Sequence, residues 1–169
     1  RAGQADYVPV GAEQRTDAVV AALAPMQRVG DLRRAAWAKA DDVLDRARVL
    51  SAAEMLGMAQ AVFDTTLDYL KQRVQFNQVL ATFQALQHRM ADLFADLAQM
   101  RSAVEAGLQA VDSGFGVARA ATIAKAEANR VLHAISNQGI QLHGGIGMTD
   151  EFNVGFYLKR ARVLEASWG

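Results

Sequence analysis

The chain has 169 residues, of which 51% are hydrophobic and 21% charged, a composition typical of a globular domain rather than of a disordered chain. Eighteen basic residues balance eighteen acidic ones, so no net charge attracts the chain to nucleic acid or to an anionic membrane, and we expect neither partner. The absence of cysteine excludes disulfides and thiolate zinc sites, and no apolar run approaches the ~20 residues that span a bilayer, so we expect a cytoplasmic protein.

Residues 1–30 have no core pattern of their own and are predicted to be the irregular or β remnant of a preceding domain. Both prolines of the chain, Pro9 and Pro25, lie in this segment. Residues 7–10 are consistent with a short edge strand, and residues 17–23 with a strand or a helical turn. Since the chain starts with Arg1 rather than Met, we expect it to be part of a longer protein.

Residues 31–169 are predicted to form an all-α domain, an up-down-up-down four-helix bundle. No proline follows Pro25, and proline is strongly excluded from helix interiors. Apolar residues at intervals of three and four predict helices over residues 41–74, 83–111, 117–140 and 152–167. Thr82 is the expected N-cap of the second helix, and Gly57 is expected to permit a close helix contact in the first.

The second helix has the clearest hydrophobic pattern in the chain. Its apolar residues step by three or four along the whole helix, which is typical of a seam that packs against neighbouring helices. This seam comprises Phe83, Leu86, Met90, Leu93, Leu97, Met100, Val104, Leu108 and Val111. We therefore predict that the seam over residues 83–111 is buried, with Met90, Leu97 and Val104 as the residues that test this.

A glycine-rich segment joins the third and fourth helices. Residues 138–151 read Q-G-I-Q-L-H-G-G-I-G-M-T-D-E and hold four glycines. Glycine reaches positive φ and lets another group approach the backbone closely. The segment is either a helix C-cap followed by a turn, which spacing alone favours, or a backbone cradle for a phosphate or ribose, with side-chain contacts from Gln141 and His143.

A second candidate cluster lies between the first two helices, with Arg73 and Phe76 at the end of one and Gln84 at the start of the next. The arginine either neutralises the negative end of a helix dipole or holds a phosphate by two parallel hydrogen bonds. Phe76 either belongs to the core or stacks on a base; spacing alone favours the first alternative in both cases. The three histidines are too scattered for a metal signature, so no metal site is predicted.

Taken together, these segments resemble the C-terminal helical domain of the acyl-CoA dehydrogenase family of flavoproteins. The resemblance covers residues 41–169 and rests on Y-L-K-Q-R-V-Q-F-N (69–77), T-F-Q-A-L-Q-H-R-M-A-D (82–92), A-K-A-E-A (124–128), Q-L-H-G-G-I-G-M-T-D-E (141–151) and Y-L-K-R-A-R (157–162). Residues 1–30 resemble the last part of the family's middle β-domain. The resemblance implies an oxidoreductase of fatty acid or steroid metabolism that acts on acyl-CoA thioesters, as a dimer or tetramer of identical or homologous subunits.

The resemblance also implies FAD as cofactor, bound largely by a neighbouring subunit. In the family's pattern Arg73 reaches the FAD pyrophosphate, Phe76 lies beside the flavin nucleotide and Gln84 contacts the adenine side. The segment that covers the adenosine end across the interface comprises Gln141, Leu142, His143, Gly144 and Gly145. The glycine that usually follows the phenylalanine is replaced here by Asn77.

The family's catalytic glutamate has no counterpart in this sequence. Its position, counted along from K-R-A-R (159–162), holds Trp168, and the position that some members use instead holds Ala47. Arg48, beside Ala47, is the expected substrate-binding residue, and Glu165 is the runner-up for a base within the chain. We therefore predict an FAD-contacting, oligomerising domain that is inactive alone. The alternative is a non-catalytic helical interaction module that has lost flavin binding.

Overall fold

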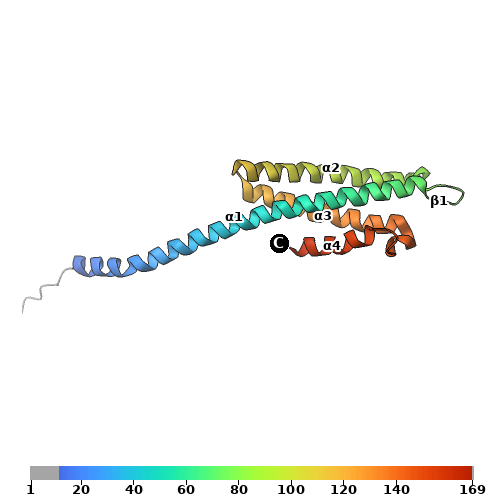
Figure 1. The fold of residues 1–169 in the computed structure, drawn as a ribbon. Helices are drawn as coiled ribbons and strands as arrows, with labels where there is room; N and C mark the ends of the chain where they lie inside the picture. Colours follow the sequence, from blue (N-terminus) through green and yellow to red (C-terminus); the bar gives the residue numbers. More distant parts are fainter. Residues whose placement is uncertain (1–11, 169) are drawn as a thin grey trace, which may run out of the picture. The chain divides into compact units, whose positions relative to one another are not determined.

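The computed structural model describes residues 12–168, with side chains from Arg28 onward (Figure 1). It divides into two compact units, one up to Asp41 and the other from Asp42 onward. The strand expected over residues 7–10 lies outside the described residues. None of the helices in the described part is both long and apolar enough to cross a membrane.

Four α-helices make up most of the described chain, which confirms the all-α class predicted from the sequence. They are α1 (Ala12–Gln72), α2 (Gln84–Ser113), α3 (Val117–His143) and α4 (Val154–Ala166). A small antiparallel hairpin, β1 (Val74–Gln75) and β2 (Gln78–Val79), and a 3-10 turn, η1 (Leu80–Thr82), connect α1 to α2. A second 3-10 turn, η2 (Gly144–Met148), follows α3.

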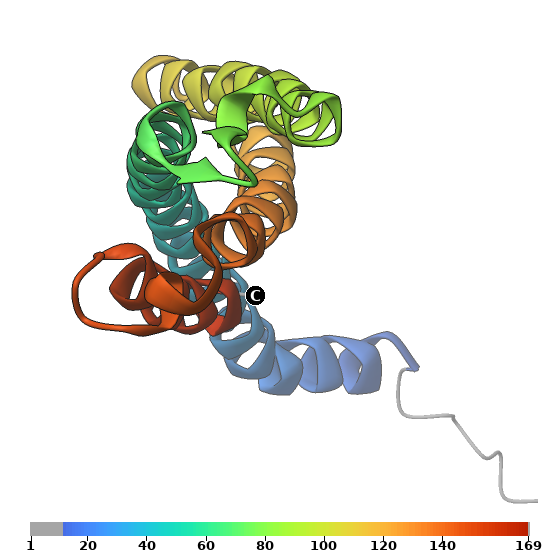
Figure 2. The same ribbon diagram turned by 90° about the vertical axis from the view of Figure 1, so that its right-hand side faces the viewer.

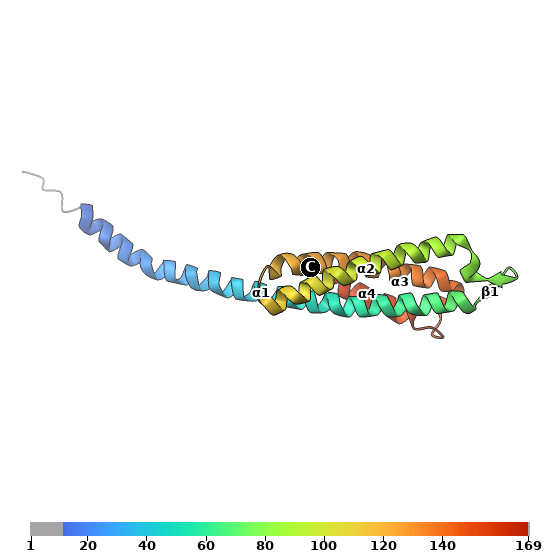
Figure 3. The same cartoon turned by 90° about the horizontal axis from the view of Figure 1, so that it is seen from above.

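In the second unit the helices run in alternating directions around one hydrophobic core, seen along the bundle in Figure 2 and from above in Figure 3. The middle of the α2 seam is buried as predicted, since Met90, Leu97 and Val104 are each no more than 7% exposed. Burial of such side chains stabilises the fold by roughly 1.5–3 kcal/mol each. The side chains of the seam are more exposed toward the end of α2, where Leu108 is 37% exposed.

Close contacts between helices occur at glycines other than the expected one. Gly57 is exposed, and a Cβ built on it has no neighbour within 4 Å, so the predicted contact at Gly57 is wrong. A Cβ on Gly139 of α3 would lie 2.7 Å from Cγ1 of Val62 on α1, and one on Gly107 of α2 would lie 3.2 Å from Cβ of Ala124 on α3. These two glycines therefore let α3 approach both α1 and α2.

Two local predictions need correction. α1 begins at Ala12 rather than near residue 41. The irregular or β structure predicted for residues 1–30 is therefore wrong for residues 12–30. Four alanines between residues 18 and 24 favour the helix. The domain boundary at residues 30 and 31 stays a prediction. Thr82 does not cap α2, because its hydroxyl donates to the carbonyl of Val79 (2.7 Å) inside η1, and Phe83 occupies the N-cap position without a side-chain hydrogen bond.

Candidate functional site

A cavity of about 340 Å³ lies where the end of α1, the hairpin, the first turns of α2 and the end of α3 meet. Its walls comprise Tyr69, Arg73, Gln75, Leu80, Leu86, Arg89, Gln141, Leu142, His143 and Gly144. The fold thus brings Arg73, directly after α1, and four of the five residues predicted from the glycine-rich segment to one place, although some 70 residues separate them in sequence. A volume of about 300 Å³ or more is typical of ligand sites in proteins.

The charged residues in the walls of this cavity are both arginines. Arg73 follows the last residue of α1 and closes its final turn, with its backbone N–H donating to the carbonyl of Tyr69 (2.9 Å). Arg89 projects from α2 one helical turn after Leu86. No aspartate or glutamate lines this cavity, and among the described side chains neither arginine forms an ion pair. The site is therefore suited to an anion.

The glycines of the turn after α3 have different roles in the fold. Gly144 has φ 65° and ψ −144°, a conformation that strongly favours glycine, and it ends the helix. At Gly147 a Cβ would lie 2.9 Å from Cβ of His143 and 3.0 Å from the carbonyl of Ile140. Gly145 does not have a positive φ, and a Cβ added to it would meet no atom within 4 Å. The helix C-cap is therefore present, but the fold itself does not require the exposed glycine at 145.

His143 is buried at the base of this turn rather than presented to solvent. It is 3% exposed, its ring stacks on Tyr69 at 4.4 Å between centroids, and it lies 4.9 Å from the ring of Phe152. Its Nδ1 lies 2.8 Å from the carbonyl of Gly139 and donates to it, while Nε2 is buried without a partner among the described residues. The Tyr69 hydroxyl donates to the His143 carbonyl (3.2 Å). The imidazole thus ties the end of α3 to α1.

We expect His143 to make the stability of the protein depend on pH. Burial lowers the pKa of His143 below its ordinary 6.5, and the hydrogen bond to Gly139 only partly opposes this. As the pH falls below about 6.5, the unfolded chain binds a proton that the folded chain does not, so the free energy of unfolding decreases until the pH passes the folded pKa. Urea unfolding between pH 7 and pH 5 measures this decrease. His143→Asn, which keeps an N–H near the place of Nδ1, should reduce it, whereas His88→Asn, at an exposed position of α2, should not. Equal pH dependence in all three proteins would contradict the prediction.

The hairpin explains two residues that the sequence alone left open. Phe76 and Asn77 form its two-residue loop, both at positive φ (52° and 62°). Asparagine tolerates this conformation better than other non-glycine residues, which accounts for Asn77 in place of the family's glycine. Phe76 is 85% exposed, so it is not a core residue, and its ring meets that of Phe83 edge to face at 6.3 Å. A bulky residue held at positive φ is strained, as is common at ligand sites.

Not all of the predicted residues line the cavity. Phe76, at the tip of the hairpin, Gln84, at the exposed first residue of α2, and Gly145 lie outside its walls. Conversely, Arg89 lines the cavity although the sequence interpretation assigned it no role. The available signal was its position three residues after Leu86, which places it next to the buried seam of α2.

Arg48 lies at a second cavity, of about 350 Å³, which also contains Lys125 and Asn129. Its guanidinium donates to the backbone carbonyl of Trp168 (2.8 Å) and pairs with Asp45 (2.8 Å). Lys125 is 3% exposed and donates to Asn129 (2.7 Å) and to the carbonyl of Leu164 (3.0 Å). Burial lowers the pKa of Lys125, nearby Glu165 opposes this, and Arg48 adds to it. Arg48 is thus engaged within the fold by two partners.

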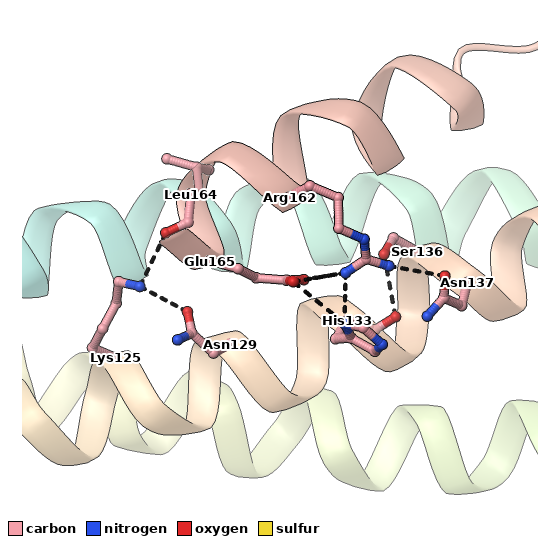
Figure 4. Close-up of polar contacts among 8 residues, drawn as sticks. All are labelled: Lys125, Asn129, His133, Ser136, Asn137, Arg162, Leu164 and Glu165. Carbon is pink, nitrogen blue, oxygen red and sulfur yellow. Dashed lines mark hydrogen bonds and ion pairs between the residues drawn. The ribbon is translucent and has the colours of Figure 1, made fainter. Parts of the chain in front are cut away.

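Glu165 belongs to a polar network between α3 and α4 (Figure 4). Both of its carboxylate oxygens accept from Nη1 of Arg162, at 2.5 and 2.7 Å, and the Glu165 side chain is 20% exposed. Nη1 of Arg162 also lies 2.5 Å from Nδ1 of His133, and its Nη2 donates to Asn137 (2.9 Å). Since a guanidinium only donates, Nδ1 of His133 is the acceptor in this contact. Glu165 is therefore held as an ion-pair partner.

Comparison with known proteins agrees with this architecture. The family model of the acyl-CoA dehydrogenase C-terminal domain matches residues 36–169. Acyl-CoA dehydrogenase IpdE2 of Mycolicibacterium smegmatis is 39% identical over 117 residues, which cover 69% of this chain and 36% of that protein. The solved structure of butyryl-CoA dehydrogenase from Megasphaera elsdenii matches with a TM-score of 0.74 and 30% identity, covering 78% of this chain and 34% of that one. A Tcur3481–Tcur3483 steroid ACAD variant matches with a TM-score of 0.72 and 33% identity, covering 75% and 35%.

The chain spans about a third of the length of the relatives that it matches. The family match extends over the whole helical bundle and includes Arg73, the hairpin and the glycine turn. The resemblance seen in the sequence motifs is thereby confirmed. The chain belongs to the acyl-CoA dehydrogenase family, of which it contains the C-terminal helical domain.

Proposed function

We propose that this chain is the FAD-contacting, oligomerising domain of a flavoprotein that dehydrogenates acyl-CoA thioesters between Cα and Cβ, and that it lacks a catalytic base of its own. The observation that carries the proposal is the cavity beside the glycine turn, lined by two arginines and by no carboxylate. A helix bundle that served only for packing has no need to place two guanidinium groups at one cavity without a carboxylate, because like charges repel each other.

The residues around this cavity fit an FAD molecule. Arg73 would hold a pyrophosphate oxygen pair by parallel hydrogen bonds. Gly145, which the fold does not require as glycine, would leave room for the adenosine end. Gln84 and Gln141, both exposed, would supply amide contacts, and the exposed Phe76 would lie against the flavin nucleotide. Bound FAD would supply the hydride acceptor of the reaction.

The local structure also supports the absence of a base. Trp168 and Ala47 occupy the two family positions for the glutamate, and neither side chain can accept a proton in this role. Glu165 is occupied by Arg162 and sits in the network between α3 and α4. Arg48, the candidate substrate-binding residue, donates from Nε to the Trp168 carbonyl and from Nη1 to Asp45, which leaves its Nη2 for contact with a substrate.

Identical or homologous subunits are the proposed partners. Large apolar side chains remain exposed on the bundle, notably Leu50 (64%), Phe94 (63%) and Val163 (55%). A subunit interface would remove this apolar surface from water. The name of the Tcur3481–Tcur3483 steroid ACAD joins two designations, which is consistent with a partner that differs from this chain.

Loss of the Arg73 guanidinium tests the FAD proposal. In the complete flavoprotein, Arg73→Ala should weaken FAD binding by roughly 10- to 100-fold, since hydrogen bonds to charged groups contribute about 1.5–3 kcal/mol. The measurement is the flavin content after gel filtration, together with a fluorescence titration of the apoprotein with FAD. Arg119→Ala, an exposed arginine in the first turn of α3, is the matched control and should bind FAD normally. Unchanged flavin content in Arg73→Ala would favour the alternative of a helical interaction module without flavin.

A further inference from the structure

We infer that Arg89 is a second phosphate-binding residue of the cavity and contacts the FAD pyrophosphate together with Arg73. This inference rests on the proposed function and extends it, because Arg89 has no role in the family pattern as read from the sequence. The two arginines come from different segments, Arg73 from directly after α1 and Arg89 from the second turn of α2, and both line the same cavity.

The surroundings of the two arginines support this role, because no carboxylate lines the cavity that they share. Six arginines of the described side chains form ion pairs with nearby carboxylates: Arg34, Arg46, Arg48, Arg130, Arg160 and Arg162. Arg73 and Arg89 are among the six other described arginines, which form no ion pair with another described side chain, and they differ from the remaining four in lining one cavity without a carboxylate. Two cations at one cavity raise the energy of the folded chain unless an anion neutralises them.

The chemistry of a diphosphate matches this arrangement. Its two phosphoryl groups each carry negative charge and each can accept a bidentate guanidinium contact, so two arginines satisfy it better than one. The start of α2 adds to the positive potential, since its first turn contains no acidic residue and its N-cap makes no side-chain hydrogen bond. The cavity of about 340 Å³ has room for a diphosphate with part of a nucleoside, not for the whole of FAD.

Arg89 can be changed without disturbing the bundle. Its side chain is exposed, whereas Met90, the next residue, is buried in the core. Arg89→Gln removes the charge and keeps most of the aliphatic stem and an amide donor, and Arg89→Lys keeps the charge but loses the planar fork. Arg119→Gln is the matched control, because it lies 22 residues before Gln141 on α3, roughly 33 Å along the helix at 1.5 Å per residue.

The experiment measures binding to the apo form of the assembled flavoprotein by flavin fluorescence, with FAD, with riboflavin, which has no phosphate, and with inorganic pyrophosphate as competitor. We expect Arg89→Gln to weaken FAD binding roughly tenfold or more, to leave riboflavin binding unchanged and to make pyrophosphate a weaker competitor, with Arg89→Lys intermediate. The dependence of FAD affinity on ionic strength should also decrease in Arg89→Gln.

The outcomes separate this inference from the proposed function. If Arg73→Ala weakens FAD binding while Arg89→Gln behaves like Arg119→Gln, the FAD site stands and the role of Arg89 is overturned. If Arg89→Gln weakens riboflavin and FAD binding equally, Arg89 does not act on phosphate and the inference is also overturned. If neither Arg73→Ala nor Arg89→Gln changes FAD affinity, both proposals fall.

Discussion

The isolated 169-residue chain is expected to show no dehydrogenation of any acyl-CoA, even with FAD in excess. The reaction as proposed removes a proton from Cα to a carboxylate while a hydride leaves Cβ for the flavin, so it needs a base within hydrogen-bond reach of that proton. Loss of a general base costs about 10²- to 10⁴-fold in rate. Here the two family positions hold Trp168 and Ala47, so we expect the base of an active assembly to come from a partner subunit or from an aspartate or glutamate outside this sequence.

The measurement is the dye-coupled oxidation of straight-chain, branched and steroid acyl-CoA thioesters. It uses protein that circular dichroism has shown to be helical. Addition of a catalytically competent partner subunit is the positive control. The Glu165→Gln chain should be as inactive as the unsubstituted chain, because Glu165 is paired with Arg162 and does not serve as a base. Turnover by the chain alone that disappears in Glu165→Gln would show that this carboxylate is a base after all.

Gly139→Ala is expected to lower the free energy of unfolding by about 1 kcal/mol, and by up to about 2 kcal/mol if Val62 cannot shift. The new Cβ would lie 2.7 Å from Cγ1 of Val62, which is fully buried and, as a β-branched residue in a helix, has essentially one rotamer. Overpacking of this kind costs about 1–3 kcal/mol, which the better helix propensity of alanine offsets by about 1 kcal/mol. Urea unfolding monitored by circular dichroism gives the change directly.

The same substitution at Gly57 is the matched control. Gly57 also lies inside a helix, but a Cβ there meets nothing within 4 Å, so Gly57→Ala should stabilise the protein by about 1 kcal/mol. Val62→Ala should couple favourably to Gly139→Ala in a double-mutant cycle, because it removes the methyl group that the new Cβ meets. A Gly139→Ala protein as stable as Gly57→Ala would mean that α1 and α3 can separate without cost.

The helices of the bundle could be predicted from the sequence because their signal is local. The three-and-four stepping of the α2 seam repeats within each turn, so Met90, Leu97 and Val104 are marked as core residues by their neighbours in the chain. The family motifs likewise carried Arg73 and the glycine turn, and the cavity brings these together. The absence of a carboxylate at Trp168 and Ala47 was evident from residue identity alone.

Contacts between distant segments decided what the sequence left open. The sequence alone does not distinguish the roles of Gly57, Gly139 and Gly145. A Cβ on Gly139 would meet Val62, so this glycine allows a helix contact, whereas a Cβ on Gly57 or Gly145 would meet no atom within 4 Å. Gly57 is therefore neutral for packing, and Gly145 leaves the backbone open to another group. His143 follows a leucine on a helix and could face either way, and only the packing of Tyr69 and Phe152 against it buries the ring.

The role of Arg89 also could not be predicted from the sequence, because it depends on which charges lie near it in space. On α2 alone it is one polar residue beside a hydrophobic seam, where a solvated side chain is the ordinary expectation. Only the arrival of α1 and α3 at the start of α2 places it in one cavity with Arg73 and without a carboxylate. Electrostatic potential depends on distance in space rather than in sequence, so a binding site for an anion becomes visible only once the helices are assembled.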